Sequence, residues 1–231
     1  MLRLLQVRAR GSYAARHEVK CVRRCLDVPT SVHSVFEADL NALVEGTTGF
    51  IVGGSGSLSL HDEATRHFED GLRRFLDAAF ERRIPGFLIC FGHQFLAHHL
   101  GAQVVTDEAR KEAGTIHVSV VGRGAEDPLF GPRAPLFFAH AGHSDHVTEV
   151  PSGTELLART PESPIQALKV HGMPVYSTQF HPDLTARDAR ARYIAAFGEG
   201  PVALEAAERF DASADSATST LIAEWWESAR A

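Results

Sequence analysis

The chain has 231 residues, of which 44% are hydrophobic and 23% are charged, a balance typical of globular proteins and not of disordered or fibrous ones. Its formal net charge is −6 and no run of Lys or Arg exceeds two residues, which argues against a nucleic-acid partner. Arg3, Arg8 and Arg10 interrupt the N-terminal segment, and no later stretch reaches the roughly 20 apolar residues of a membrane span. Neither export nor a membrane partner is therefore expected.

The cysteines indicate a reducing compartment. There are three of them, Cys21, Cys25 and Cys90, and an odd number in a chain of this length argues against a disulfide framework. Cys21 and Cys25 are four residues apart on a predicted helix, but two thiols without further nearby cysteines make a poor zinc site. We expect a cytoplasmic protein with no metal and no cofactor.

The first half of the chain alternates strands and helices. Apolar runs predict strands at residues 2–7, 49–52 and 85–89, and the second of these continues into the small-residue loop at 53–57. Helical or partly helical segments are predicted at residues 13–27, 31–44, 62–83 and from Cys90 to Gly101. Such alternation implies crossover connections and a mostly parallel sheet flanked by helices, an α/β fold.

The second half is composed of strand-sized pieces, with helices only at its end. We expect additional strands at residues 104–105, 116–121, 136–139, 155–158, 165–170 and 175–180, and a closing helix at 186–197. The run Gly198-Glu199-Gly200-Pro201 predicts a boundary between one domain at residues 1–198 and a helical tail at 199–231. The tail carries Trp225 and Trp226, either for docking a partner or for packing on its own domain.

Cys90 lies between an apolar strand and a helix, with Gly92 two residues later. This arrangement resembles a nucleophile elbow, in which a sharp turn lifts the reactive side chain clear of the sheet. The helix N-terminus favours a thiolate there, and the backbone N–H of Phe91 is placed to bind an oxyanion. The pattern predicts a cysteine nucleophile.

A second strand ends in His181-Pro182-Asp183 and supplies the matching base. An imidazole can take the proton of a thiol, and a carboxylate two residues further on can hold the other ring nitrogen. Because both segments follow strands, we expect Cys90, His181 and Asp183 to meet as a triad.

Four segments together resemble the class I (triad) glutamine amidotransferases, in particular free-standing glutaminase domains of the GMP-synthase-like type. The run CFGHQ at 90–94 is similar to the family's elbow, and QFHPD at 179–183 is similar to its Gln-Phe-His-Pro-Glu segment. Residues 50–57 resemble its glycine-rich oxyanion loop, and HSDHV at 143–147 with VPSG at 150–153 resembles its Ser-His-Gly-Asp region. The similarity covers about residues 2–197 and implies the flavodoxin-like fold of that family.

The resemblance also implies roles for individual residues. The nucleophile, base and acid would be Cys90, His181 and Asp183, and a γ-glutamyl thioester would form on the cysteine. Backbone groups near Gly54, Ser55 and Phe91 would form the oxyanion hole. Bound glutamine would be contacted at Gln94, Gly142 and His143.

Three departures from the family pattern lead to structural expectations. Leu88 stands where the family usually has Gly, two residues before the nucleophile, and we expect it to crowd the elbow. Asp183 replaces the usual Glu and is one methylene shorter, so the strand end has to approach His181 more closely. The loop Gly53-Gly54-Ser55-Gly56 replaces the commoner Ser-Gly-Gly-Pro.

Three functions fit this pattern. The leading hypothesis is a free-standing glutaminase that releases ammonia and glutamate from glutamine and supplies the ammonia to a separate synthetase subunit. The alternative is a γ-glutamyl peptidase or hydrolase acting on γ-glutamyl peptides, amines or glutathione conjugates. The third hypothesis, motivated by Leu88 and the Trp-bearing tail, is a catalytically degenerate binding subunit.

Overall fold

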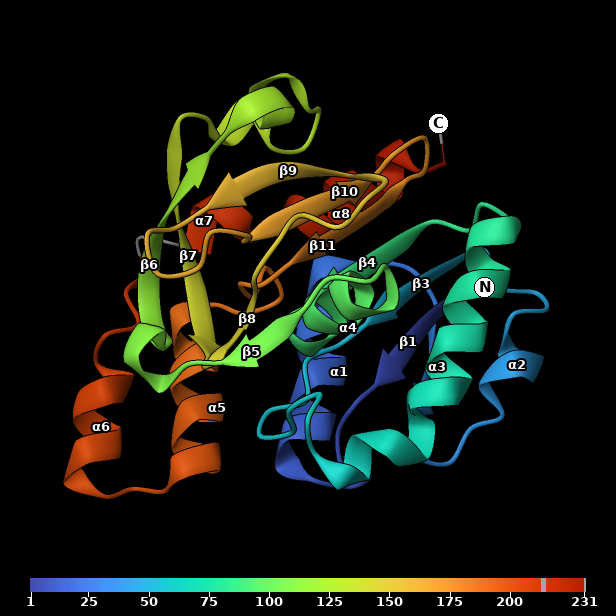
Figure 1. The fold of residues 1–231 in the computed structure, drawn as a ribbon. Helices are drawn as coiled ribbons and strands as arrows, with labels where there is room; N and C mark the ends of the chain where they lie inside the picture. Colours follow the sequence, from blue (N-terminus) through green and yellow to red (C-terminus); the bar gives the residue numbers. More distant parts are fainter. Residues whose placement is uncertain (213–214, 231) are drawn as a thin grey trace.

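A large mixed sheet forms the centre of the molecule in a computed structural model of the chain (Figure 1). Residues 1–212 and 215–230, the part that the structure describes, contain a nine-stranded sheet in the order β2-β1-β3-β4-β11-β10-β9-β6-β7 and a two-stranded sheet of β5 and β8. The strands are β1 (Leu2–Gln6), β2 (Thr30–Ser34), β3 (Gly49–Val52), β4 (Gly86–Ile89), β5 (Val104–Thr106), β6 (Glu112–Val120), β7 (Leu136–His143), β8 (Asp145–Val147), β9 (Thr154–Arg159), β10 (Ala167–Val170) and β11 (Val175–Thr178).

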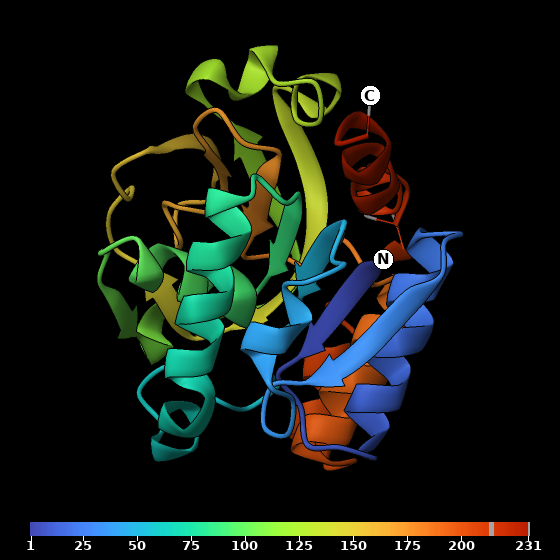
Figure 2. The same cartoon turned by 90° about the vertical axis from the view of Figure 1, so that its right-hand side faces the viewer.

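Helices cover both faces of this sheet. They are α1 (Tyr13–Cys25), α2 (Leu40–Leu43), α3 (Glu63–Glu81), α4 (Phe91–His99), α5 (Ala186–Phe197), α6 (Pro201–Ala207), α7 (Asp215–Thr218) and α8 (Leu221–Ser228). Figure 2 shows α3 on one side of the parallel strands and α1 and α8 on the other. Two apolar cores result, one beneath α3 and α4 and one beneath α1 and α8.

Five strands form the parallel part of the sheet. β1 pairs in parallel with β2 and β3, and β4 pairs in parallel with β3 and β11. The inner strands β3, β4 and β11 are buried along their whole length, as expected of strands that are covered on both faces. Their carboxyl ends lie at one edge of the sheet, where α/β proteins place their ligands.

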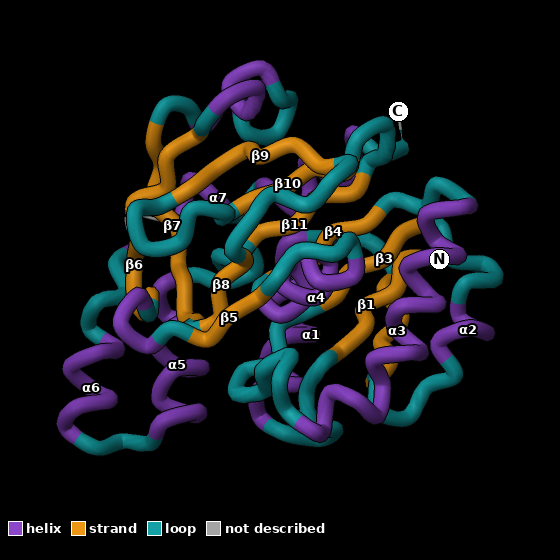
Figure 3. The backbone as a smooth tube through the Cα atoms, viewed as in Figure 1, coloured by secondary structure: helices purple, strands orange, loops and turns teal. Residues whose placement is uncertain are grey.

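The antiparallel strands extend this sheet. β10, β9, β6 and β7 follow β11 in antiparallel pairs, and the small sheet of β5 and β8 contacts α4 (Figure 3). The predicted α/β class, with a parallel sheet flanked by helices and additional antiparallel strands, is confirmed.

One sequence prediction holds only in part at the edge of the sheet. The sequence predicts a helical or partly helical segment at residues 31–44; Leu40–Leu43 are helical, but Thr30–Ser34 form strand β2. Val32 pairs with Leu4 of β1, so an edge of the sheet recruits a polar segment that lacks a period-2 apolar pattern. Asp39 then starts the short helix, since its carboxylate accepts hydrogen bonds from the N–H groups of Asn41 and Ala42.

The C-terminal helix packs back on the domain. Trp225 is fully buried, its ring lies 5.6 Å from that of Phe87, and its indole N–H donates to the carbonyl of Pro174 at 3.0 Å. Gly49 leaves room for Trp226, because a Cβ there would lie 2.3 Å from the indole. The division of the chain at residue 198 remains a prediction, and residues 213, 214 and 231 of the tail lie outside the described part.

The helices in the described ranges include none with both the length and the apolar character needed to cross a membrane.

Candidate active site

Cys90 occupies a strained turn between β4 and α4. Its φ of 53° and ψ of −103° are rare for a residue with a side chain, and such conformations persist where the surrounding structure enforces them. Here the Cys90 N–H donates to the carbonyl of Thr178 at 2.8 Å, while its carbonyl accepts the first intrahelical bond from Gln94 at 3.0 Å. The predicted strand, sharp turn and helix are all present.

The residues around this turn are packed without spare volume. A Cβ on Gly92 would lie 2.6 Å from the carbonyl oxygen of Val52 and 3.2 Å from the Cβ of Leu88, so only glycine lets α4 lie this close to β3 and β4. Leu88 is fully buried in the core beneath α3 and α4. Its side chain therefore fills core space next to the elbow, and the turn at Cys90 forms with it in place.

His181 and Asp183 reach the same edge of the sheet. β4 and β11 are parallel neighbours with Ile89 opposite Thr178, so the residues that follow the two strands emerge side by side. His181 lies beside Cys90, since both residues flank the backbone of Gly54, and its Nδ1 lies 3.0 Å from Asp183 Oδ1. The shorter acid does reach the imidazole, and the three predicted residues meet in space.

His181 and Asp183 each stabilise the charged form of the other. Although burial opposes protonation, Asp183 and Cys90 together raise the pKa of His181 to about 9. Burial likewise opposes ionisation of Asp183, but Arg192, His181 and Arg8 hold the pKa of that carboxyl well below its ordinary value. At neutral pH the pair is thus an imidazolium held by a carboxylate.

Arg192 on α5 is a member of this group that sequence reasoning missed. Its Nη2 donates to Asp183 Oδ2 at 2.9 Å, and Arg24 of α1 donates to the backbone carbonyl of Asp183 at the same distance. Both carboxylate oxygens of Asp183 are therefore engaged, one by His181 and one by Arg192. Nothing in the local pattern of α5 distinguishes Arg192 from a surface arginine.

A buried ion pair explains the glycines of the loop after β3. Arg8 Nε lies 3.0 Å from Glu18 Oε1 with both side chains buried, and this pair lies directly under the loop. A Cβ on Gly53 would lie 2.5 Å from the Glu18 carboxylate, and one on Gly56 would lie 2.9 Å from the Arg8 guanidinium. Arg8 follows β1 at the carboxyl edge of the sheet, and that position is a sequence signal that could have identified it.

Gly54 lies against the reacting groups. A Cβ there would approach His181 Cε1 to 3.1 Å and the Cβ of Cys90 to 3.5 Å. Ser55 comes next, and its hydroxyl donates to the carbonyl of Leu58. Phe91 opens α4, so its N–H is one of the amides that a helix leaves without an internal acceptor. The backbone of the three predicted oxyanion residues is thus close to Cys90 on two sides.

The predicted substrate-contacting residues form a second group. The Gln94 amide nitrogen donates to the carbonyl of Asp145 at 3.2 Å and to Gln179 at 3.1 Å. His143 contacts the same carbonyl through Nδ1 at 3.0 Å and Glu112 through Nε2 at 2.8 Å. These side chains hold α4, β7 and β8 together. Gly142 lies on β7 with open space at its Cβ position.

The site is nearly closed. Cys90 and His181 each keep 8% of their surface exposed, and two pockets in the described ranges lie elsewhere, one between α1 and α5 and one beside β9 and β10. A substrate can reach the sulfur only through this remaining surface.

Comparison with known proteins identifies the family to which this sequence belongs. The sequence model of the family described as "Glutamine amidotransferase class-I" matches residues 15–199, most of the chain. The chain belongs to the class I glutamine amidotransferases. The resemblance seen in the sequence is therefore confirmed at the level of the family, and strands β4 and β11, which precede Cys90 and His181, lie within the matched range.

The relatives of this class I glutamine amidotransferase include proteins of similar length and longer proteins. It is 27% identical over 184 residues to a glutamine-hydrolyzing GMP synthase subunit of Methanothermobacter thermautotrophicus, a match that covers 80% of this chain and 90% of the relative. It is 34% identical over 125 residues to the glutamine-hydrolyzing GMP synthase of Pseudomonas aeruginosa, covering 52% of this chain but only 24% of that longer protein.

A solved structure of a glutamine amidotransferase has the same fold. The glutamine amidotransferase of Thermotoga maritima superposes with a TM-score of 0.73, covering 99% of this chain and 97% of the other at 19% sequence identity. The fold of this class I glutamine amidotransferase, including its antiparallel extension, therefore recurs in a protein of low sequence identity.

Proposed function

We propose that this protein hydrolyses the side-chain amide of glutamine, with Cys90 as nucleophile, His181 as acid and base, and Asp183 as the group that orients His181. The observation that carries this proposal is the position of Cys90, at the start of α4, beside His181, whose Nδ1 lies 3.0 Å from Asp183 Oδ1. Nucleophile, proton carrier and orienting carboxylate are the components that acyl transfer through a thioester requires.

The first half-reaction releases ammonia. The Cys90 sulfur attacks the amide carbon, and the carbonyl oxygen becomes an oxyanion that the N–H groups of Phe91 and of Gly54 or Ser55 stabilise. His181 then donates its proton to the amide nitrogen, the carbon–nitrogen bond breaks, and a γ-glutamyl thioester remains on Cys90. A His181 that is protonated at neutral pH suits this step, because the leaving group must gain a proton.

The second half-reaction releases glutamate. A water molecule loses a proton to His181 and attacks the thioester, and the sulfur leaves as the thiolate that started the cycle. We propose that Gln94, Gly142 and His143 line the glutamine site, Gly142 through its exposed backbone and Gln94 through its amide oxygen. Since the cycle needs a reduced sulfur, the proposal keeps the cytoplasm as the location, where the three free cysteines stay reduced.

A separate synthetase is the proposed acceptor of the ammonia. Support comes from the relatives that are named as one subunit of GMP synthase, since this chain matches 90% of the length of one of them. In the longer relatives the matched part is only a quarter of the protein. We propose that this chain provides the glutaminase half of such a pair.

The test is glutamate release from glutamine, with and without candidate synthetases, by the purified chain and two variants. We expect Cys90→Ser to lose hydrolysis by on the order of 10³-fold or more, because an unactivated hydroxyl replaces the thiol. Cys25→Ser is the matched control: it changes a partly buried thiol on α1, outside the triad, and should retain full activity.

Covalent labelling provides a second readout. Intact mass after incubation with diazo-oxo-norleucine should show one adduct confined to Cys90 and absent from Cys90→Ser. Neither glutamate release nor labelling at Cys90, with any synthetase tested, would overturn the proposal. Turnover of γ-glutamyl peptides or amines far faster than glutamine would contradict glutamine as the substrate, while leaving Cys90 as the nucleophile.

A further inference from the structure

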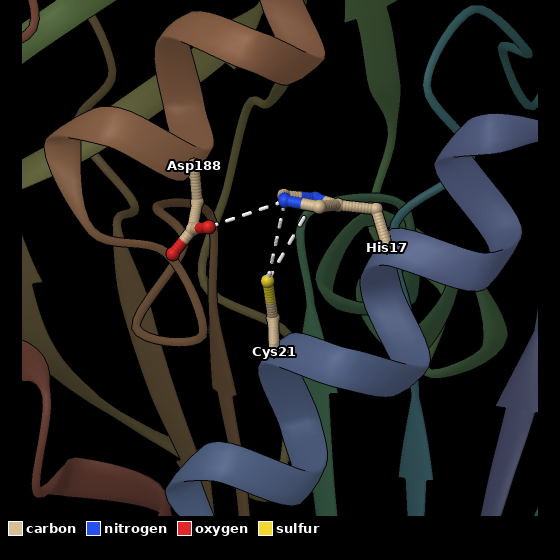
Figure 4. A group of neighbouring side chains, drawn as sticks. All are labelled: His17, Cys21 and Asp188. Carbon is tan, nitrogen blue, oxygen red and sulfur yellow. Dashed lines mark hydrogen bonds and ion pairs between the residues drawn. The ribbon is translucent and has the colours of Figure 1, made fainter.

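A second pocket lies on the far side of α1 from the central sheet, between α1 and α5. It has a volume of about 510 Å³, within the range of small-molecule sites. Its lining includes four basic side chains around a histidine and a tyrosine: Arg16, Lys20, Arg24, Arg187, His17 and Tyr13. Figure 4 shows His17 and Asp188 pointing toward each other from α1 and α5 at this place.

The positive charge of this pocket is largely uncompensated. Arg24 pairs with Asp188 at 2.6 Å, but within the described ranges no carboxylate lies at ion-pair distance from Arg16, Lys20 or Arg187. Three cations without a carboxylate partner among the described residues thus line one pocket of a chain whose net charge is −6, and the Arg16 guanidinium donates a hydrogen bond to the carbonyl of Gly11. Such a local reversal of sign concentrates anions at this surface.

The positions of these basic residues also destabilise helices α1 and α5. Arg16 and Lys20 lie four residues apart on α1, where like charges repel. Arg187 lies in the first turn of α5, where the helix dipole disfavours a cation. Departures from local rules without a structural gain are typical of functional sites.

A metal ion does not suit the same place. His17, Cys21 and Asp188 bring their donor atoms within 4.8 Å of one another, the only such group in the described part of the chain. However, burial raises the pKa of the Cys21 thiol to about 11, His17 Nδ1 accepts a hydrogen bond from Arg192, and Asp188 is paired with Arg24. The donors are occupied, and the surrounding charge repels a cation.

We propose that this pocket binds the phosphate group of a phosphorylated small molecule. A phosphate offers several strong acceptor oxygens and about two negative charges, which matches a cluster of guanidinium and ammonium donors. The exposed ring of Tyr13 stacks on His17 at 5.3 Å between centroids and gives the attached part of the ligand a flat apolar surface. The site is separate from the reaction centre but connected to it, because Arg24 lines the pocket and also holds the backbone of Asp183.

Calorimetric titration of the full chain with inorganic phosphate, adenosine monophosphate and adenosine tests this site. We expect saturable binding of the two phosphate-bearing probes and none of adenosine. The double variant Lys20→Ala/Arg187→Ala should weaken binding by about tenfold or more, the loss expected when charge-assisted hydrogen bonds are removed. Both side chains are exposed, so the fold should tolerate their loss.

The matched control is Arg66→Ala/Arg74→Ala on α3, which removes the same charge on the opposite side of the sheet. It should leave binding unchanged. The proposal is overturned if neither phosphate-bearing probe saturates at millimolar concentration, if both double variants lose binding equally, or if adenosine binds as well as its monophosphate. None of these outcomes depends on glutamine hydrolysis, so this site and the proposed reaction can fail independently.

Discussion

At the scale of single residues, the site depends on how Asp183 is held. One of its oxygens contacts His181 and the other accepts from Arg192, so the carboxylate cannot rotate without losing a charge-assisted bond. The same contacts keep it ionised although it is buried. The orientation and charge of His181 therefore depend on Asp183, and those of Asp183 depend in turn on Arg192.

Changing Asp183 to Asn should remove most of the activity and alter the titration of His181. We expect glutamine hydrolysis to fall by about 10³- to 10⁴-fold, as when a triad aspartate becomes asparagine in other hydrolases. The pKa of His181, raised to about 9 in the native protein, should fall because its main electrostatic support is lost. Nuclear magnetic resonance titration of the His181 ring measures this shift.

The Asp183→Asn substitution should also change how the free energy of unfolding depends on pH. A histidine whose pKa is raised on folding contributes stability that is present below about pH 6.5 and is lost as the pH rises through about 9. Native stability should fall over this range more steeply than that of Asp183→Asn. Asp127→Asn, another buried carboxylate, which contacts Lys169 and Tyr176, should keep the native slope and activity. Equal slopes in native protein and Asp183→Asn would contradict the assigned coupling.

At the scale of elements, the contact of α4 with β3 and β4 determines where the sulfur lies. Helix α4 begins at the residue after Cys90, and its second residue, Gly92, faces the backbone of Val52. Leu88 packs beside Gly92 in the core beneath α3 and α4. The expected crowding by Leu88 is thus avoided because the glycine beside it carries no side chain.

Alanine at Gly92 tests how tightly α4 is held. Its Cβ would lie 2.6 Å from the Val52 oxygen, so α4 must move away, and we expect a loss of about 1–3 kcal/mol in the free energy of unfolding. Gly71→Ala on α3 is the control, since its nearest neighbour would be Leu40 Cδ1 at 3.5 Å. That change should be neutral or stabilise by up to about 1 kcal/mol. Urea denaturation measures both, and an unaffected Gly92→Ala would show that α4 is free to shift.

At the scale of the whole molecule, the C-terminal helix completes a core. The cluster beneath α1 includes Leu4 and Phe87 of the parallel strands together with Trp225 of α8. Arg133 also binds Glu224 of α8 at 2.8 Å. The last helix is thus held by apolar burial and by an ion pair, and it covers the sheet face that α1 leaves open (Figure 2).

Removal of the Trp225 side chain should therefore destabilise the whole domain. We expect Trp225→Ala to cost about 3–5 kcal/mol, the range for deleting a large buried aromatic side chain, with the loss seen in thermal and urea unfolding. Phe197→Ala is the control, because Phe197 at the end of α5 is 58% exposed and its loss should change stability by no more than about 0.5 kcal/mol. A native-like stability of Trp225→Ala would mean that α8 is dispensable for the fold.

The sequence by itself determined the local motifs. The apolar strand before Cys90, the glycine after it and the His-Pro-Asp segment were readable because a tight turn, a helix start and a strand end depend on neighbouring residues. The alternation of strands and helices likewise predicted the α/β class. The family also followed from these segments.

Only the tertiary structure decided which distant residues meet. The pairing of β4 with β11 brings Cys90 to His181, and the packing of α5 brings Arg192 to Asp183. The strand at residues 30–34 and the burial of Trp225 were equally undecided in the sequence. Strand register, buried ion pairs and the docking of a terminal helix depend on contacts between segments far apart in the chain, whose energies local patterns do not contain.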